Sequence, residues 1–307
     1  MKCSSHPVPS TEDGSEAADL SRPTSAIQLH GDEATKKLVV IIQPATAVPE
    51  SLYHAFASYL AERGFLAVTY NYSGVGAVAR CRSSRSIRMV DWVCDADAVI
   101  DAIRLRFPSD PLVVIGHSFG GHAAGLSHRS RFFTAVVLVA SHAGSMRFIQ
   151  PRLERAKATF LLHILGPVLT KMLGYMPGRR LGIGEDLPAG VMRQWRQWTK
   201  LKHYFFDDPR LKASARFAEL RCPILCYSFS DDPWATEPAV GELVRHFKNA
   251  DVERRRVDTK ALGTGPIGHF GFFRQRHRDH IWPGVAQWLE EVVAAQQPRF
   301  DPKIDHD

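Results

Sequence analysis

The sequence predicts an α/β fold with a mainly parallel, doubly wound sheet and an inserted helical cap. Short, continuous apolar runs, typical of strands buried on both faces, alternate with segments of helical period. This alternation stops over residues 147–210, where helical segments rich in Leu, Met, Trp and Arg take its place, and then resumes. Strands that alternate with helices form parallel sheets, and handed crossovers place the helices on both faces.

The first half of the chain supplies two pairs of a strand and a helix. Residues 38–43 are an apolar run that ends in Gln, and residues 49–63 have apolar positions at helical spacing. Residues 65–70 repeat the strand pattern. Residues 89–107 place their large apolar side chains on one helical face, and Pro108 ends that segment.

Four further strands and a last helix complete the pattern. Strands are expected over residues 111–115 and 134–140, with a helix between them. Two more strands are expected over residues 223–227 and 252–257, and a final helix over residues 285–295. No internal repeat is visible, so one sheet is expected to collect all of these strands.

This pattern divides the chain into five parts. The N-terminal residues are rich in Ser, Pro, Glu and Asp, so we expect a flexible leader that passes into a weak hairpin. The expected parts are the leader and hairpin over 1–36, the first part of the core over 37–146, the cap over 147–210, the second part of the core over 211–297 and a C-terminal tail over 298–307.

Composition and charge limit the class of partner. With 45% hydrophobic and 23% charged residues the chain is close to the globular average, so it can bury a large core. The net charge of +7 would suit an acidic partner, but the basic residues are scattered and accompany no nucleic-acid motif. We expect solvated surface and no nucleic-acid partner. The basic clusters are Arg179-Arg180, Arg254-Arg255-Arg256 and Arg274, Arg276 and Arg278.

Cysteines and apolar runs indicate the environment of the protein. Five cysteines without regular spacing predict reduced thiols, and Cys222 and Cys226 lack two further zinc ligands, so no metal and no cofactor are expected. No apolar stretch of signal-peptide length follows Lys2. The longest apolar stretch, residues 160–169, is about half of a spanning helix and is interrupted by Gly166-Pro167. We expect a soluble, cytoplasmic protein without stable membrane insertion, and the sequence leaves its oligomeric state open.

Residues 116–120, with the sequence Gly-His-Ser-Phe-Gly, carry the strongest chemical signal. They directly follow a predicted strand and precede a helix of small residues. A serine at such a turn has a strained backbone, and glycines on both sides avoid clashes while its Oγ projects above the sheet. The helix N-terminus stabilises developing negative charge. The pattern predicts Ser118 as a nucleophile.

A serine hydroxyl needs a general base, which a downstream histidine is expected to supply. His269 lies in a Gly-rich turn after the last strand and before the last helix, so we expect it to be this base. Two histidines beside the nucleophile, His117 and His122, are expected to be packing or rim residues. Weaker candidates for the base are His142, His277 and His280.

Asp231 and Asp232 are the candidates for the acid that orients the base, because they follow the strand over residues 223–227. Neighbours on one loop point in different directions, so only one of them reaches the imidazole. We favour Asp232 and expect Asp231 to cap the following turn.

Two backbone N–H groups are expected to form an oxyanion hole, which holds the charged oxygen of a tetrahedral intermediate. One is the N–H of Phe119. The other belongs to Ala45 or Thr46, in the loop after the first strong strand, since Pro44 has no N–H.

Two further groups of residues are expected to have no catalytic role. The segment Gly74-Val-Gly76 lacks the third Gly of a dinucleotide fingerprint and the Lys of a phosphate loop, so we expect it at the rim of the site. Asp91, Asp95 and Asp101 lie off the apolar face of their helix and are expected to be solvated.

The chain resembles the α/β-hydrolase superfamily, and within it predicted bacterial hydrolases related to serine aminopeptidase-like and acyl-hydrolase enzymes. The resemblance covers most of the chain and implies the α/β-hydrolase fold with a catalytic triad of Ser118, Asp232 and His269. In the superfamily the acid usually stands four residues before a Pro or similar residue, a place that Thr236 takes here. The matching segments are residues 69–76, 116–121, 173–177, 186–190, 230–232 and 268–273.

The chain departs from the superfamily pattern in two places. Relatives tend to carry Asp and Arg where this chain has Asn71 and Ser73, and many carry His-Gly where it has Gln43-Pro44. These positions bear on substrate specificity and on the second oxyanion donor, and they leave the triad residues in place.

The expected activity is hydrolysis of an ester, thioester or amide of a small, partly apolar acyl substrate through an acyl-enzyme, with a carboxylic ester preferred. Acyl transfer by the same triad is the nearest competing activity, and a non-catalytic binding protein on the same fold is the third. Trp195 and Trp198 of the cap are expected to contact substrate, unless they pack inside the cap. The same two roles are open to Phe160, Leu161, Leu162 and Leu165.

Overall fold

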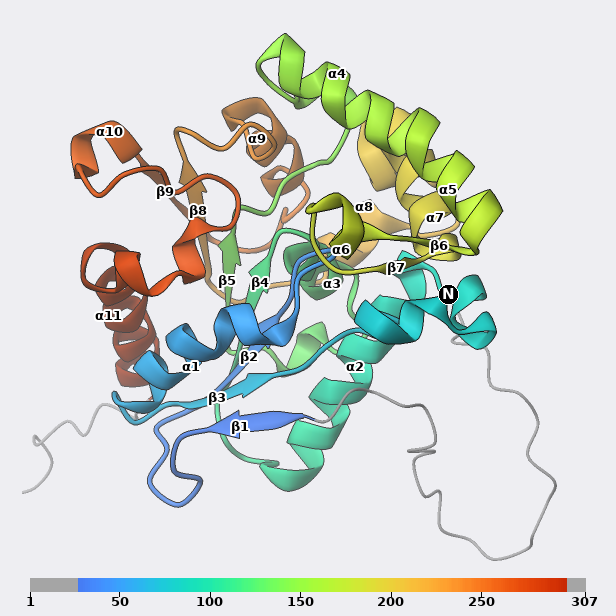
Figure 1. Cartoon of the computed structure of the whole chain (residues 1–307). Coiled ribbons are helices and arrows are strands. Elements are labelled where there is room, and N and C mark those ends of the chain that lie inside the picture. The colour runs from blue at the N-terminus through green and yellow to red at the C-terminus, as the bar shows by residue number, and fades with distance from the viewer. Residues whose placement is uncertain (1–26, 297–307) are drawn as a thin grey trace, which may run out of the picture.

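Seven strands form the central sheet, in the order β1-β3-β2-β4-β5-β8-β9 (Figure 1). The structure is a computed structural model and describes residues 27–296. All neighbouring strands are parallel except β1 and β3, which confirms the predicted mainly parallel sheet. The strands are β1 (Gln28–His30), β2 (Val39–Gln43), β3 (Leu66–Thr69), β4 (Leu112–His117), β5 (Ala135–Val139), β8 (Ile224–Phe229) and β9 (Val252–Val257).

Burial explains why the apolar runs form strands. Every residue of β2, β3, β4, β5 and β8 is buried, as in parallel sheets with helices on both faces. The edge strand β9 is partly exposed, and its Arg254 and Arg256 both form ion pairs with Glu237. Charged side chains on an edge strand oppose pairing with another chain.

The N-terminal part differs from the prediction. Strand β1 pairs with β3 in antiparallel register, with Leu29 opposite Val68, and does not form a hairpin with the next strand in sequence. This pairing covers an edge of β3 that would otherwise be open. Residues 1–26 and 297–307, which include most of the predicted leader and the whole predicted tail, lie outside the described residues.

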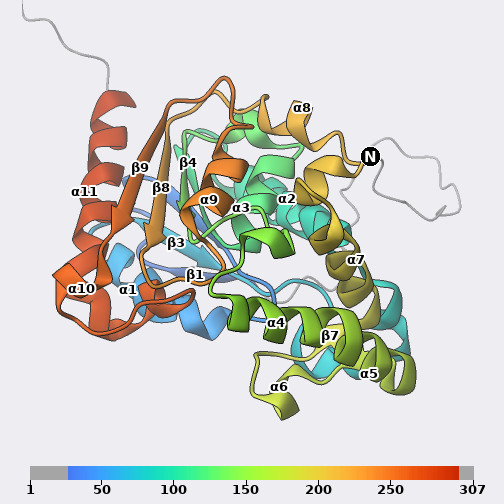
Figure 2. The ribbon, with the colours of Figure 1, turned by 90° about the horizontal axis from the view of Figure 1, so that it is seen from above.

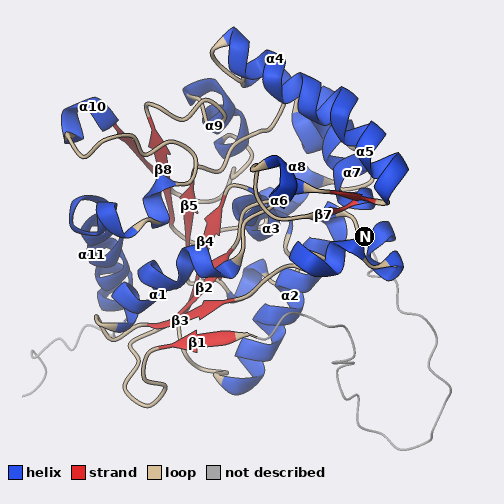
Figure 3. Ribbon diagram, in the orientation of Figure 1, coloured by secondary structure: helices blue, strands red, loops and turns tan. Residues whose placement is uncertain are grey.

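Helices cover both faces of the sheet (Figure 3). Helix α1 packs against α11 on one face, and α2 and α8 pack against α3 on the other. Helix α11 begins seven residues before the predicted start because Ile281 and Trp282 are buried in the core, which favours helix in spite of Pro283. These helices are α1 (His54–Ala61), α2 (Met89–Arg106), α3 (Phe119–Leu126), α8 (Ala213–Phe217), α9 (Glu237–Val244), α10 (Thr259–Leu262) and α11 (Arg278–Gln296).

We call residues 146–207, between β5 and β8, the cap segment. Figure 2 shows its helices together, beyond the end of the sheet toward which β8 and β9 point. The segment agrees with the expected helical character of this region, and its standing as a separate cap remains a prediction. Its elements are α4 (Arg152–Phe160), a π-helical turn (Leu161–Leu165), α5 (Gly166–Leu173), β6 (Tyr175–Met176), α6 (Gly178–Leu181), β7 (Leu187–Pro188) and α7 (Ala189–Lys200).

The expected interruption at Gly166-Pro167 is wrong. One continuous helix runs over Arg152–Leu173, and within residues 27–296 it is the one helix long and apolar enough, by length and composition, to cross a membrane. The N–H of Gly166 donates to Leu161 O, five residues back, so the helix is wider here. A wider turn relieves the clash that proline causes in an α-helix.

The cysteines agree with the prediction only in part. Cys81, Cys222 and Cys226 are free, as expected of reduced thiols. Cys94 is disulfide-bonded, so the expectation is wrong for this residue. No local sequence pattern marks Cys94 for this role, because its flanking residues belong to the amphipathic helix α2.

Asp95 is buried, which corrects the expectation of a solvated side chain. Its Oδ2 accepts a hydrogen bond of 2.9 Å from the Ser73 N–H, because the loop after β3 packs over this side of α2. Asp101 is partly exposed, as expected, and pairs with Arg129. Residues 27–296 contain no group of three or more His, Cys, Asp or Glu side chains that could hold a metal ion.

Candidate active site

Ser118 lies at the turn between β4 and α3, where the sequence predicts it. Its φ of 50° and ψ of −109° are unusual for a residue with a side chain. A Cβ at Gly116 would lie 2.4 Å from Gly121 N, and a Cβ at Gly120 would lie 2.1 Å from Gln43 O. The close approach of the two strands and the helix therefore requires glycine on both sides of the serine.

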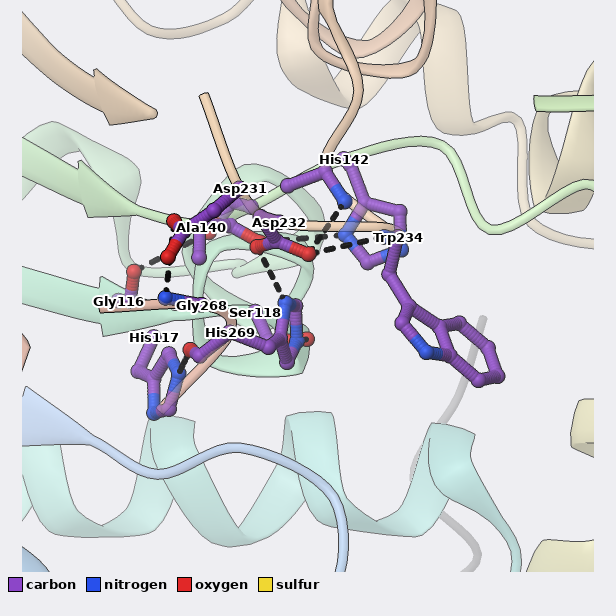
Figure 4. A network of polar contacts seen from close by, with 12 residues as sticks. Gly116, His117, Ser118, Ala140, His142, Asp231, Asp232, Trp234, Gly268 and His269 are labelled. Carbon is purple, nitrogen blue, oxygen red and sulfur yellow. Dashed lines mark hydrogen bonds and ion pairs between the residues drawn. The ribbon is translucent and has the colours of Figure 1, made fainter. Parts of the chain in front are cut away.

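Ser118, His269 and Asp232 form one line of hydrogen bonds (Figure 4). His269 Nε2 lies 2.9 Å from Ser118 Oγ, and His269 Nδ1 lies 2.7 Å from Asp232 Oδ2. The Asp232 side chain is fully buried and that of His269 is 11% exposed. Each residue follows the carboxyl end of a parallel strand, which is why positions 151 residues apart meet.

Asp231 holds the loop that carries His269. Its Oδ2 accepts a hydrogen bond of 2.8 Å from the Ile267 N–H, and its Oδ1 accepts one of 3.0 Å from the Gly268 N–H. The expectation that Asp231 caps the turn after itself is wrong. The sequence offers no signal for this contact, because it joins two loops 36 residues apart.

Asp232 caps the following turn while it contacts His269. Its Oδ1 accepts hydrogen bonds from the N–H groups of Trp234 and Ala235, at 2.8 and 3.0 Å. Burial alone would raise the pKa of this carboxyl, but His269, His142 and the Ala235 N–H together lower the pKa to about 2. The carboxylate is therefore ionised at neutral pH.

His117 links the loops on either side of the site. Its Nε2 lies 2.8 Å from the carbonyl oxygen of His269, which only accepts, so Nε2 carries the proton. Burial and the nearby His269 lower the pKa of His117 to about 3, so Nδ1 is unprotonated and accepts from the Tyr53 hydroxyl at 2.9 Å. Tyr53 in turn accepts from the Ala45 N–H at 2.8 Å. The chain of donors fixes the backbone of His269 relative to the loop after β2.

His142, a weaker candidate for the base, packs beside His269 with ring centroids 5.3 Å apart. Its Nδ1 donates to the Ala140 carbonyl at 3.1 Å, and its own carbonyl accepts from His122 Nε2 at 2.6 Å. Burial lowers the pKa of His142 to about 4 and that of His122 to about 3. Both are neutral donors that pack the site.

His277 and His280, the two remaining candidates for the base, have different surroundings. His277 Nδ1 lies 3.3 Å from Thr264 Oγ1, and its Nε2 accepts a hydrogen bond of 3.0 Å from Arg276 Nε. His280 is exposed on α11. Since His269 Nε2 holds the contact with Ser118 Oγ, neither of these two histidines takes the place of the base.

As the pH falls, we expect the fold to lose stability before the Asp232 carboxylate is protonated. Burial holds His117, His122 and His142 neutral in the folded chain, because it lowers the pKa of each from the ordinary histidine value of 6.5. As the pH falls below 6.5 the unfolded chain takes up protons that the folded chain does not, so stability is lost from there down to about pH 4 for His142 and down to about pH 3 for His117 and His122. Each histidine contributes about 1.4 kcal/mol per pH unit, measured as the free energy of urea unfolding. Asp232 adds nothing above about pH 4, because its contribution is lost between about pH 4 and pH 2.

His122→Gln is the matched variant for this prediction. A glutamine amide can still donate to the His142 carbonyl, but it does not titrate. The slope of unfolding free energy against pH, measured between about pH 6 and pH 5, should fall by about 1.4 kcal/mol per unit. An unchanged slope would show that His122 is protonated in the folded chain.

Two of the three sequence candidates for the oxyanion hole have backbone N–H groups that donate to no described residue, and the third donates to Tyr53. Phe119 is the first residue of α3, where N–H groups have no partner inside the helix. The Ala45 N–H already donates to Tyr53, which corrects its place as a candidate donor. The Thr46 N–H donates no hydrogen bond to any residue in the range 27–296, and Thr46 lines the cavity described next.

A cavity of about 300 Å³ opens over Ser118 and His269. Most of its lining is apolar, and ten of its 21 lining residues come from the cap segment, so it fits an apolar group attached to the reacting carbon. Phe270, beside His269, is 43% exposed at its edge. The apolar cap residues in the lining are Leu161, Leu162, Met176, Ile183, Leu187, Met192 and Trp195.

The two tryptophans expected to contact substrate lie in different places. Trp195 lines the cavity opposite Trp234, with ring centroids 6.3 Å apart. Trp198 is buried away from the cavity, where its Nε1 donates to Asp208 Oδ2 at 3.0 Å. The expectation for Trp198 is wrong, because its ring packs against those of Tyr204 and Phe205 and not against the cavity.

The sequence matches the alpha/beta hydrolase family over residues 30–295. The chain belongs to the alpha/beta hydrolase family. This membership confirms the superfamily resemblance and the α/β-hydrolase fold. A search of curated proteins finds no match to this alpha/beta hydrolase.

Solved structures of other proteins share the fold of this alpha/beta hydrolase at low sequence identity. A soluble variant of monoglyceride lipase from Saccharomyces cerevisiae is 12% identical, with a TM-score of 0.62 over 87% of this chain and 91% of that one. The monoacylglycerol lipase of Paleococcus ferrophilus is 14% identical, with a TM-score of 0.55 over 88% and 98%. A thermophilic esterase from Thermogutta terrifontis is 13% identical, with a TM-score of 0.53 over 87% and 93%.

Proposed function

We propose that this alpha/beta hydrolase is a serine hydrolase that cleaves a carboxylic ester with a partly apolar acyl group. The observation that carries the proposal is the unbroken contact from Ser118 Oγ through His269 to the buried, ionised Asp232. The family and the fold-sharing esterase and lipases support ester hydrolysis. The apolar lining over Ser118 supports an apolar acyl group.

In the proposed first step His269 Nε2 takes the proton of Ser118 Oγ, which attacks the ester carbonyl carbon. The N–H groups of Phe119 and Thr46 stabilise the negatively charged carbonyl oxygen of the tetrahedral intermediate. Asp232 stabilises the imidazolium and keeps the His269 Nδ1 proton in place. His269 then gives its proton to the leaving alcohol, which yields an acyl-enzyme.

In the proposed second step water attacks the acyl-enzyme carbonyl and His269 removes the water proton. Return of that proton to Ser118 Oγ releases the carboxylic acid. Acyl transfer would differ only in the attacking group. The ratio of acid to new ester formed in the presence of added alcohol separates the two reactions.

The first experiment is labelling by a fluorophosphonate, which reacts covalently with an activated serine. We expect the native chain to be labelled at Ser118, because His269 deprotonates its hydroxyl. Ser118→Ala should abolish labelling, and the matched control Ser214→Ala, in α8 outside the cavity lining, should retain it. A native, folded chain that stays unlabelled would favour a non-catalytic binding protein.

A further inference from the structure

The outer face of the cap helix Arg152–Leu173 is apolar and has no partner in the described part of the chain. Only 17% of its apolar stretch is buried. Phe160, Ile164, Val168 and Met172 are spaced by four residues, so they lie on one face, and they are 53%, 56%, 50% and 75% exposed. We call these four residues the outer stripe. Apolar residues at this spacing normally face a core.

The outer stripe is not needed to hold the helix in place, because the opposite side of the helix does so. Ala158, Leu162 and Thr170 are buried against the rest of the molecule. Leu161 and Leu162 also line the cavity. The helix therefore has one apolar face for the fold and a second that is free for a partner.

Cations without carboxylate partners lie on the helix that carries the outer stripe and on α6. Residues 151–184 hold six Lys and Arg side chains and one acidic side chain, Glu154, which pairs with a neighbouring lysine. Arg152, Lys171 and Arg180 are exposed and form no ion pair with any described residue of the chain. An exposed apolar stripe with free cations beside it is the arrangement of helices that lie in a membrane interface. Anionic lipids attract such cations.

We infer that the outer stripe docks the protein onto a membrane that contains anionic phospholipids, with the helix parallel to the surface. A second copy of this chain fits less well, because two such faces carry the same positive charge. Ile183 and Phe270, which are 44% and 43% exposed, both line the cavity, so the cavity has exposed apolar side chains of its own.

The test is sedimentation of the full chain with phosphatidylcholine vesicles, prepared with and without phosphatidylglycerol. The Ser118→Ala form is used so that no vesicle lipid is cleaved, which makes the result independent of the proposed function. We expect binding to phosphatidylglycerol vesicles that weakens as salt is raised. Replacement of Phe160, Ile164 and Met172 together by Ser should lower the partition coefficient at least about tenfold, because apolar area is removed from the interface.

Leu105→Ser is the matched control for the apolar change. Leu105 is 84% exposed on α2 and lies fifteen residues, about 22 Å of helix, from Val90, which contacts the cap helix α7. The partition coefficient of the Leu105→Ser variant should equal that of the Ser118→Ala chain from which it is made. Replacement of Arg152, Lys171 and Arg180 together by Gln should weaken binding to phosphatidylglycerol vesicles and remove most of the salt dependence.

Two results would overturn the inference. One is a parent chain that does not bind the vesicles, or that binds as well after the triple Ser change. The other is a parent dimer, measured by light scattering after size exclusion, that the triple Ser change converts to a monomer, because this assigns the stripe to a second copy. An unchanged circular dichroism spectrum and melting temperature show that the triple Ser variant is folded.

Discussion

Ser118→Ala is expected to lower kcat on a small carboxylic ester by about 10⁶-fold and to leave the fold intact. The side chain is small and its Oγ makes one hydrogen bond, to His269, so its loss creates no large cavity. Without the hydroxyl no acyl-enzyme forms, and only the contribution of the backbone N–H groups and the cavity remains. Initial rates on a chromogenic ester measure the loss, and circular dichroism with a thermal melt checks the fold.

The same measurement on His269→Ala should show a loss of similar size, and the double variant should lose little more. Residues that act as one unit are not additive, because either deletion removes the whole unit. A double variant as slow as the product of the two single effects would show that the residues act independently. Native rates for Ser118→Ala would overturn the proposed nucleophile.

Local patterns in the sequence predicted the parts of the fold and site that depend on neighbouring residues. Strands β2 to β5 are buried on both faces, so each is a continuous apolar run. Such a run is visible in the sequence without knowledge of the rest of the chain. The turn at Ser118 needs glycines at fixed offsets, and these are visible in the sequence. The order of strand, acid and histidine along the chain places Asp232 and His269 at the same sheet edge as Ser118.

What the sequence did not show depends on contacts between distant loops. The Tyr53 hydroxyl accepts a hydrogen bond from the Ala45 N–H. This contact depends on His117, which lies on another strand and holds the Tyr53 hydroxyl in place. The cap helix Arg152–Leu173 continues through Pro167 because a π-helical turn precedes this proline. No residue type in the sequence indicates that turn. The burial of Trp198 depends on where α7 packs against Asp208. Each of these contacts requires the tertiary fold.

The two neighbouring aspartates are expected to differ sharply when each is changed to Asn. Asp232→Asn should lower kcat by about 10⁴-fold, because the neutral amide does not stabilise the His269 imidazolium and favours the wrong tautomer. Asp231→Asn should lower kcat by at most about 10²-fold. It keeps one acceptor for the Ile267 and Gly268 N–H groups and weakens only the position of the His269 loop.

The split between kcat and KM separates an electrostatic role from a positioning role in these two variants. Asp232→Asn removes the carboxylate that contacts His269 Nδ1, so the loss should fall on kcat while KM stays near the native value. Asp231→Asn keeps that contact and changes the geometry of the His269 loop, so its smaller loss should appear in KM as well as in kcat, because Phe270 of the same loop lines the cavity. Circular dichroism must show a native fold for both. If Asp231→Asn is the crippled variant and Asp232→Asn stays active, the roles are reversed; if both keep native rates, His269 does not depend on a carboxylate.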